Sequence, residues 1–150
     1  MEQNTHFLEI VSGGKYAMIK NVKDLIAIAN EARNNSYAPY SKYKVGAALL
    51  CKDGTVITGC NIENASFTVG ICAERTAFAK ALSEGKTEFD AIAIVGNTSN
   101  RPTPPCGACR QFMSEFVGKD FEIIEASPDG DFVIRKMSEL FPDIFMLFHT

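Results

Sequence analysis

The chain has 150 residues, of which 46% are hydrophobic, and its 15 Lys plus Arg against 18 Asp plus Glu give a net charge of -3. This size fits one domain with its own core, and the absence of a block of like charge argues against a nucleic-acid partner. No apolar run approaches the roughly 20 residues of a membrane span and no export signal precedes the domain, so we expect a cytoplasmic protein without a membrane partner.

The first convincing element begins near Asn21. Residues 1–17 lack a helical period and contain Gly13-Gly14, so we interpret them as an N-terminal extension that is dispensable for folding, the alternatives being a non-native segment or a mis-called start. The domain then covers residues 18–150 and starts at Met18. Apolar residues at helical spacing predict a helix from Asn21 that ends before Pro39. A hairpin follows, with a tight turn at Asp53-Gly54 between strands Val45–Cys51 and Thr55–Cys60.

The second half alternates helices and strands. Good helix formers followed by Gly85 predict a helix from Cys72 to Glu84, and helical spacing returns from Cys106 to Gly118 after a proline-rich loop. Short apolar runs predict three further strands: Asp90–Val95, Phe121–Glu125 and Phe132–Arg135. A short last helix is expected near Ser138–Phe141.

The connection between the last two strands is short. It has strong turn chemistry, Ser127-Pro128-Asp129-Gly130, and so short a connection requires antiparallel pairing. The element order predicts an α/β fold in three layers, a mixed five-stranded sheet between helices whose last two strands are antiparallel.

The cysteines are the main chemical signal. Five cysteines without an export signal argue against a disulfide framework, and the only histidines, His6 and His149, lie near the chain ends. Cys106 and Cys109 share one face of a helix start, and Cys72 begins another helix, where free amides favour the thiolate. Three ligands leave zinc one position for water, as in catalytic sites, and Glu74 is expected to lie beside that water.

Other interpretations of the cysteines stay open at this point. Two unrelated cysteines are often simply buried in a core, and a Cys-x-x-Cys pair can be a redox site. A closed structural site that uses Cys60 as a fourth ligand is a further alternative, although it leaves Glu74 without a purpose.

Longer blocks add a family resemblance. Cys72-x-Glu74 followed by Pro105-Cys106-x-x-Cys109 matches a zinc deaminase signature. The blocks Ser36–Ser41, Val45–Leu49, Gly59–Ala65, Cys72–Ala77 and Pro105–Gln111, in this order, resemble the cytidine deaminase family over about residues 22–145. Residues 1–17 lie outside the resemblance.

The resemblance implies the chemistry of the site. Cys72, Cys106 and Cys109 hold Zn²⁺, Glu74 shuttles protons, and a zinc-activated water removes the amino group of cytidine or deoxycytidine, a reaction of pyrimidine salvage. Arg75 is expected to donate to ligand sulfurs, which offsets the charge of three thiolates.

The resemblance also implies how the nucleoside is bound. Asn61 and Glu63 match the residues that hold the ribose hydroxyls, although without the resemblance they can equally close a turn. Ala73 is a further expected substrate contact, and Tyr43, where the family commonly has phenylalanine, is expected to stack on the pyrimidine. Phe67 likewise replaces a common tyrosine. The effect of either departure on kinetics, and the preference between the two sugars, do not follow from the sequence.

The C-terminal segment provides a prediction about subunit assembly. Residues 139–145 resemble the family's C-terminal segment, whose phenylalanine reaches a neighbouring subunit. Phe145 takes that place, which predicts a homotetramer with shared sites. The rival functions are a nucleic-acid editing deaminase, which lacks its basic channel here, a blasticidin-type deaminase, and a non-enzymatic zinc-binding module.

Overall fold

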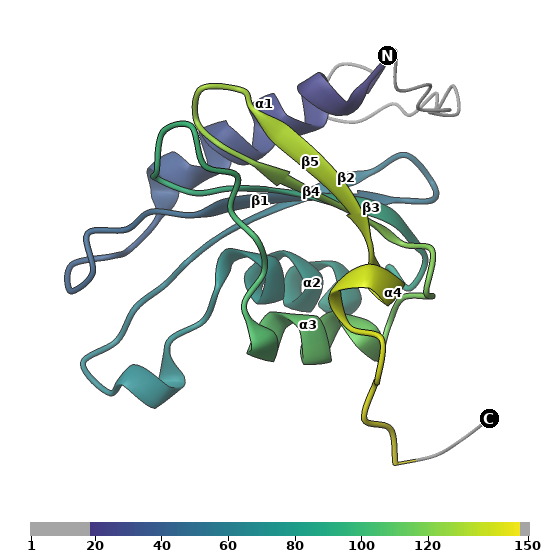
Figure 1. Ribbon diagram of the computed structural model, residues 1–150. Coiled ribbons are helices and arrows are strands. Elements are labelled where there is room, and N and C mark those ends of the chain that lie inside the picture. Colours follow the sequence, from purple (N-terminus) through teal and green to yellow (C-terminus); the bar gives the residue numbers. More distant parts are fainter. Residues whose placement is uncertain (1–18, 148–150) are drawn as a thin grey trace.

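The computed structural model describes residues 19–147, which form a mixed sheet with helices on both faces (Figure 1). The helices are α1 (Val22–Ala32), α2 (Ala73–Ser83), α3 (Gly107–Ser114) and α4 (Met137–Leu140). The strands are β1 (Gly46–Cys51), β2 (Val56–Cys60), β3 (Phe89–Val95), β4 (Glu122–Ala126) and β5 (Phe132–Lys136). Two 3₁₀ turns, η1 (Arg33–Asn35) and η2 (Phe67–Val69), complete the list.

The five strands lie in the order β2-β1-β3-β4-β5. β3 and β4 are parallel, while β1 is antiparallel to both β2 and β3. β4 and β5 are antiparallel, with Ile124 opposite Ile134. The predicted three-layer architecture and the antiparallel last strand pair are therefore confirmed.

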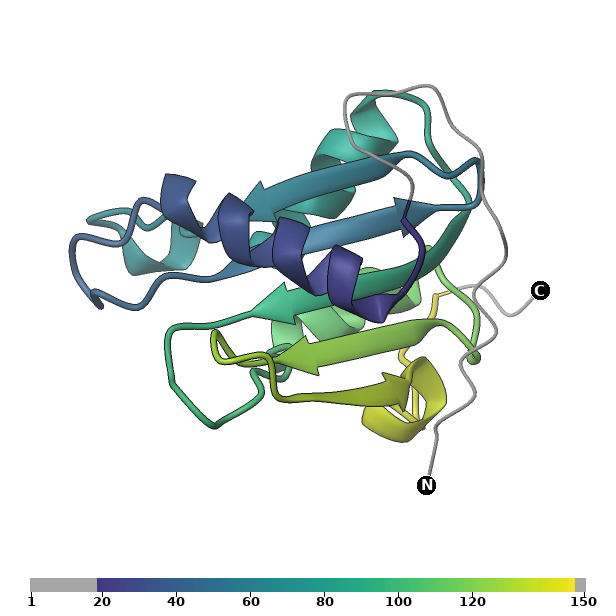
Figure 2. The ribbon, with the colours of Figure 1, turned by 90° about the horizontal axis from the view of Figure 1, so that it is seen from above.

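Of the described helices, only α1 covers one face of the sheet, and it lies over the strands in Figure 2. Asn21 caps the helix, because its side chain accepts from the backbone N–H of Asp24 at 3.2 Å. The buried residues of α1 recur at helical spacing and pack on alternate residues of β1, β3 and β4, such as Leu50, Val95 and Ile124. This periodicity is the reason that the sequence predicts the helix so well.

The opposite face is covered by α2 and α3. Phe78 of α2 is fully buried at the centre of this layer and contacts four aromatic rings, those of Phe89, Phe112, Phe116 and Phe121, at centroid distances between 4.9 and 6.5 Å. α2 ends where Gly85 adopts a positive φ of 82°, a conformation that glycine accommodates without strain. The two helices that follow the candidate ligands thus rest on one shared core.

α2 lies unusually close to β2 at one glycine. A Cβ atom added to Gly59 would lie 2.4 Å from the carbonyl oxygen of Ala73 and 2.5 Å from the backbone nitrogen of Ala77. Only glycine permits this approach between strand and helix backbones. Gly59 therefore sets the depth at which the first turn of α2 sits on the sheet.

The observed elements differ from the expected ones mainly at their ends. α3 ends at Ser114 instead of continuing to Gly118, and past its end the backbone N–H groups of Phe116 and Val117 both donate to the carbonyl of Met113. α4 begins at Met137, since the carboxylate of Glu139 accepts from the backbone N–H of Lys136 at 2.6 Å. The turns η1 and η2 were not predicted.

Between residues 19 and 147, no helix has the length and apolar character that a membrane crossing demands. Residues 1–17, interpreted as an extension, and both histidines, His6 and His149, lie outside the described residues. The domain bounds at 18 and 150 stay a prediction.

Candidate active site

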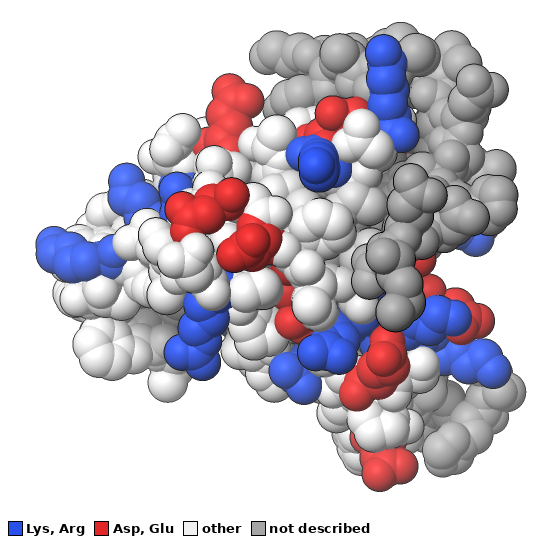
Figure 3. Space-filling model, turned by 45° about the horizontal axis from the view of Figure 1, so that its top comes forward, with Lys and Arg blue, Asp and Glu red and all other residues white. Residues whose placement is uncertain are grey.

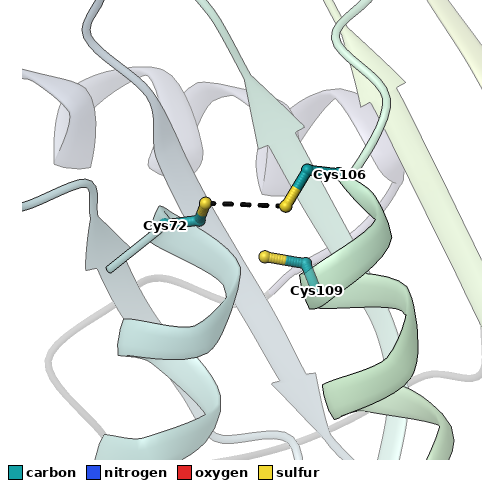
Figure 4. Close-up of side chains that lie close together, drawn as sticks. All are labelled: Cys72, Cys106 and Cys109. Carbon is teal, nitrogen blue, oxygen red and sulfur yellow. Dashed lines mark hydrogen bonds between the residues drawn. The ribbon is translucent and has the colours of Figure 1, made fainter. Parts of the chain in front are cut away.

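Cys72, Cys106 and Cys109 converge from the starts of two helices (Figure 4). Their sulfur atoms all lie within 4.8 Å of one another, and those of Cys72 and Cys106 are 3.7 Å apart. Cys60 does not belong to this group. The structure therefore gives a three-thiol cluster and no support to a closed four-cysteine site.

Local backbone structure explains the convergence. Cys72 is the N-cap of α2 and Cys106 the N-cap of α3, both with extended φ and ψ angles and without a side-chain capping bond. Cys109 lies in the first turn of α3 and is fully buried. The positive ends of two helices consequently point at the sulfurs, which favours thiolates.

Hydrogen bonds within the cluster affect which cysteine sulfurs keep their protons. The pKa of Cys72 is lowered mainly by the hydrogen bond that it accepts from the Cys109 thiol, and Arg75, whose Nη2 lies 3.8 Å from the Cys72 sulfur, lowers it further. The pKa of Cys109 is raised because its thiol makes that bond. Because the cluster favours the thiolate form of Cys72, it is suited to binding a cation.

Glu74 lies in the first turn of α2, two residues after Cys72, and is 4% exposed. Burial raises the pKa of its carboxyl to about 7, and the negative charge of Cys72 acts in the same direction. A carboxyl of this kind exchanges a proton near neutral pH, as a general acid and base must.

The cluster fits zinc. With zinc–sulfur bonds of about 2.3 Å, tetrahedral geometry places two thiolate sulfurs about 3.8 Å apart, close to the distance between Cys72 and Cys106. Three soft thiolates suit zinc and leave one position for a small molecule. Arg75, which is half-buried, places a positive charge beside the thiolates, and its buried Nε has no hydrogen-bond partner among the described residues.

Asn61 and Glu63 lie where β2 leaves the sheet, and the structure brings both to the loop over residues 37–45. The Asn61 amide accepts from the backbone N–H of Val45 at 2.9 Å and donates to the carbonyl of Tyr43 at 2.8 Å. The Glu63 carboxylate accepts from the backbone N–H of Tyr40 and from the hydroxyl of Ser41. Those bonds, that of Ser41 first, lower the pKa of Glu63.

A pocket of about 410 Å³ opens beside these residues, within the range of small-ligand sites. It is lined by Tyr40, Ser41, Glu63, Asn64, Phe67 and Gly70. Ser41 and Tyr40 were not assigned a role from the sequence, although both belong to a block that carries the family resemblance. Their contribution is tertiary, since the donors to Glu63 come from a distant loop.

Tyr43 has partners for the hydroxyl that distinguishes it from phenylalanine. Its oxygen lies 3.2 Å from the hydroxyl of Thr98 and 3.4 Å from that of Thr103, both in the loop before α3. Gly96 allows this approach, because a Cβ there would lie 2.5 Å from the Tyr43 hydroxyl. The ring is thereby attached to the loop that leads to Cys106.

Ala73 and Phe145 are the two remaining expected site residues, and their surroundings differ from each other. Ala73 is fully buried beside Cys72 at the start of α2. Phe145 is 67% exposed on the C-terminal segment, and its carbonyl accepts from the Gln111 side chain at 3.1 Å. The described chain therefore brings the three cysteines, Glu74 and Arg75 together but leaves the Phe145 ring outside that group.

Charged side chains of both signs are interspersed on the face in Figure 3. No basic stripe crosses this face, so it offers nothing that favours a nucleic-acid backbone. The absence of a nucleic-acid partner stays a prediction.

A three-thiolate cluster beside a buried proton-exchanging carboxyl, on helices that cover one face of a mixed sheet, defines the class of zinc-dependent hydrolytic deaminases. Residues 19–124 match the family described as the cytidine and deoxycytidylate deaminase zinc-binding region. The chain belongs to the cytidine deaminase family.

Individual relatives agree with this assignment. A cytidine deaminase of Halalkalibacterium halodurans is 52% identical over 121 residues, which cover 81% of this chain and 91% of the relative. The crystal structure of a cytidine deaminase from Burkholderia pseudomallei superposes with a TM-score of 0.80 at 47% identity, covering 83% of this chain and 99% of the other. A blasticidin-S deaminase of Bacillus cereus is 33% identical over 126 residues, covering 79% and 88%. The similarity to cytidine deaminases is thus the greater.

Proposed function

We propose that this protein deaminates cytidine and deoxycytidine hydrolytically to uridine and deoxyuridine, with release of ammonia. The observation that supports the proposal most directly is the convergence of three cysteine sulfurs within 4.8 Å beside the buried Glu74. Cys72, Cys106 and Cys109 would hold Zn²⁺. When bound, zinc lowers the pKa of its water to about 7.

Glu74 moves the protons in this proposal. Its carboxylate accepts a proton from the attacking water and delivers it to the ring nitrogen next to the reacting carbon. It then passes a second proton to the departing amine, so that cytidine and water give uridine and ammonia. A pKa near 7 suits both directions of transfer. Because the side chain is buried, bulk water does not compete for these protons.

Arg75 offsets the charge of the ligands. Three thiolates exceed the charge of a divalent ion by one, and that excess opposes loss of a proton from water. The guanidinium donates to the Cys72 sulfur at 3.8 Å and withdraws part of the negative charge. Arg75 therefore acts on the water through a ligand, without touching it.

The nucleoside assignment depends on Glu63 and the pocket that it lines. Glu63 and Asn61 supply a carboxylate and an amide suited to the ribose hydroxyls, and Tyr43 supplies a ring for the pyrimidine. Asn61 is already bonded to the backbone on both sides, so it also holds the loop that bears Tyr43. Ala73 stays a proposed substrate contact at the base end of the site.

A homotetramer with sites shared between subunits is also proposed. Exposed apolar side chains lie around the pocket, with Phe67 80% and Val69 62% exposed, and Phe145 on the C-terminal segment is 67% exposed. A neighbouring chain would cover them. Action on free nucleosides in the cytoplasm, in pyrimidine salvage, completes the proposal.

Ammonia release from cytidine, with zinc measured on the same sample, tests the function. We expect about one zinc per chain and turnover of cytidine far above that of cytosine or cytidine monophosphate, because a free base leaves polar groups of the pocket unpaired. Blasticidin S serves as the competing substrate. Active protein without zinc, or a faster reaction with blasticidin S than with cytidine, would contradict the proposal.

A further inference from the structure

Arg110 connects two segments of the chain that the catalytic proposal leaves unrelated. It follows Cys109 on α3 and is half-buried. Its Nε donates to the carbonyl of Pro105 at 3.0 Å, and its Nη1 donates to the carbonyl of Leu140 at 2.9 Å. One planar guanidinium thus holds two backbone carbonyls from different parts of the sequence.

The first carbonyl belongs to the residue before a zinc ligand. Pro105 is fully buried, and Cys106 follows it as the N-cap of α3 without a side-chain capping bond of its own. The backbone N–H of Arg110 also donates to the carbonyl of Cys106 at 3.0 Å. Backbone and side chain of Arg110 therefore hold both residues that determine where the Cys106 sulfur lies.

The second carbonyl ends α4. Leu140 is the last residue of that helix, where a carbonyl has no partner within the helix. The neighbour of Arg110 continues the contact, since Gln111 donates to the carbonyl of Phe145 at 3.1 Å. Two consecutive residues of α3 therefore hold the C-terminal segment at Leu140 and at Phe145.

A buried carboxyl lies in the field of the same guanidinium. Glu125 of β4 is 7% exposed, and its Oε1 has no hydrogen-bond partner within residues 19–147. Burial raises the pKa of Glu125, while the positive charges of Arg135 and Arg110 lower it. Arg110 could therefore matter for its charge alone, and the test has to separate that role from positioning.

We propose that Arg110 is a positioning residue that fixes the Cys106 side of the zinc site and the C-terminal segment in one arrangement, so that zinc retention depends on its two carbonyl contacts. The inference rests on the proposed zinc site. The planar fork of the guanidinium is essential to it, because an ammonium group is a point charge and cannot hold both carbonyls at the geometry seen here.

The test measures release of zinc from the loaded, full-length protein to a chromogenic chelator. Arg110→Gln and Arg110→Lys should both release zinc faster, by about 10- to 100-fold as for other groups that orient metal ligands. Amide hydrogen exchange over residues 141–147 should also accelerate in both variants. Arg135→Gln, at an exposed position, is the matched control and should behave as the unmodified protein.

Two further variants separate the roles. Gln111→Ala should accelerate exchange near Phe145 and leave zinc release unchanged. Arg110→Gln combined with Glu125→Gln removes the unbalanced buried charge, and zinc release should stay fast. Recovery of normal release in Arg110→Lys or in that double variant would assign Arg110 a charge role and overturn the inference, as would normal release in Arg110→Gln. Failure of the unmodified protein to hold zinc would instead refute the proposed function.

Discussion

Gly59→Ala tests how the sheet positions the metal ligands. The added methyl group would lie 2.4 Å from the carbonyl oxygen of Ala73 and 2.5 Å from the backbone nitrogen of Ala77. These are backbone atoms, so no side-chain rotation relieves the overlap. Because ordinary contacts begin at about 3.5 Å, α2 has to move away from β2 by about 1 Å.

This displacement has two measurable effects. Overpacking of this kind costs about 1–3 kcal/mol, which for a chain of this size lowers the melting temperature by roughly 2–12 °C. Since Cys72 and Glu74 lie in the displaced turn and Cys106 on the other helix does not move with it, the site geometry changes as well. A shift of about 1 Å at such a site can lower turnover about 100-fold.

The assay combines thermal unfolding by circular dichroism with initial rates of cytidine deamination on zinc-loaded protein. Gly118→Ala is the control, because a Cβ at Gly118 meets no atom within 4 Å. Gly46→Ala is a second comparison, since its Cβ would lie 2.0 Å from the carbonyl of Ala29 in α1, across the sheet. It should lower stability with a smaller loss of turnover. Normal turnover in Gly59→Ala would refute the link between this contact and the site.

Further predictions concern the site itself. Glu74→Gln should retain zinc and lose about 10²–10⁴-fold in turnover; normal turnover would remove Glu74 from the mechanism. In zinc-free protein the pKa of Glu74 is about 7 against an ordinary 4.5. This difference contributes folding stability on the order of 3 kcal/mol, which is fully present below about pH 4.5 and is lost as the pH rises through 7. Chemical unfolding should therefore show Glu74→Gln as the less pH-sensitive protein in that window, and equal slopes would contradict the assignment. Tyr43→Phe should cost at most about 1.5 kcal/mol in binding, the worth of the threonine contacts, while Tyr43→Ala should raise KM much more; equal effects would give the hydroxyl the larger role. Co-expression of Glu74→Gln with Phe145→Ala chains should restore activity above either parent if sites are shared, and no recovery would place Phe145 elsewhere.

The sequence predicted the elements that have a clear local cause. α1 has five buried residues at helical spacing and a capping asparagine, and the turn before β5 is too short for any pairing except an antiparallel one. The three-cysteine cluster was also predictable, because residue spacing and helix starts are both visible in the sequence. The structure confirms that the three cysteine sulfurs lie close together, while the roles of the three cysteines remain predictions.

Tertiary contacts account for most of the structural features that the sequence did not predict. The apolar spacing continues past Ser114, so it does not mark the observed end of α3, and η2 is a single turn with no amphipathic period. The partners of Glu63 lie more than twenty residues earlier in the chain, and no local pattern announces such a pairing. The backbone contacts of Arg110 were equally hidden, since any carbonyl can accept a hydrogen bond.

The three cysteine sulfurs come from two helices that are distant in the sequence, since Cys72 and Cys106 are 34 positions apart. A bound ion therefore closes a loop of the polypeptide and acts as a cross-link between α2 and α3. Metal at 100 times its dissociation constant would add about 2.7 kcal/mol to folding stability. Zinc scarcity would thus reduce how much of this enzyme survives quality control in a cell, in addition to silencing the molecules that remain.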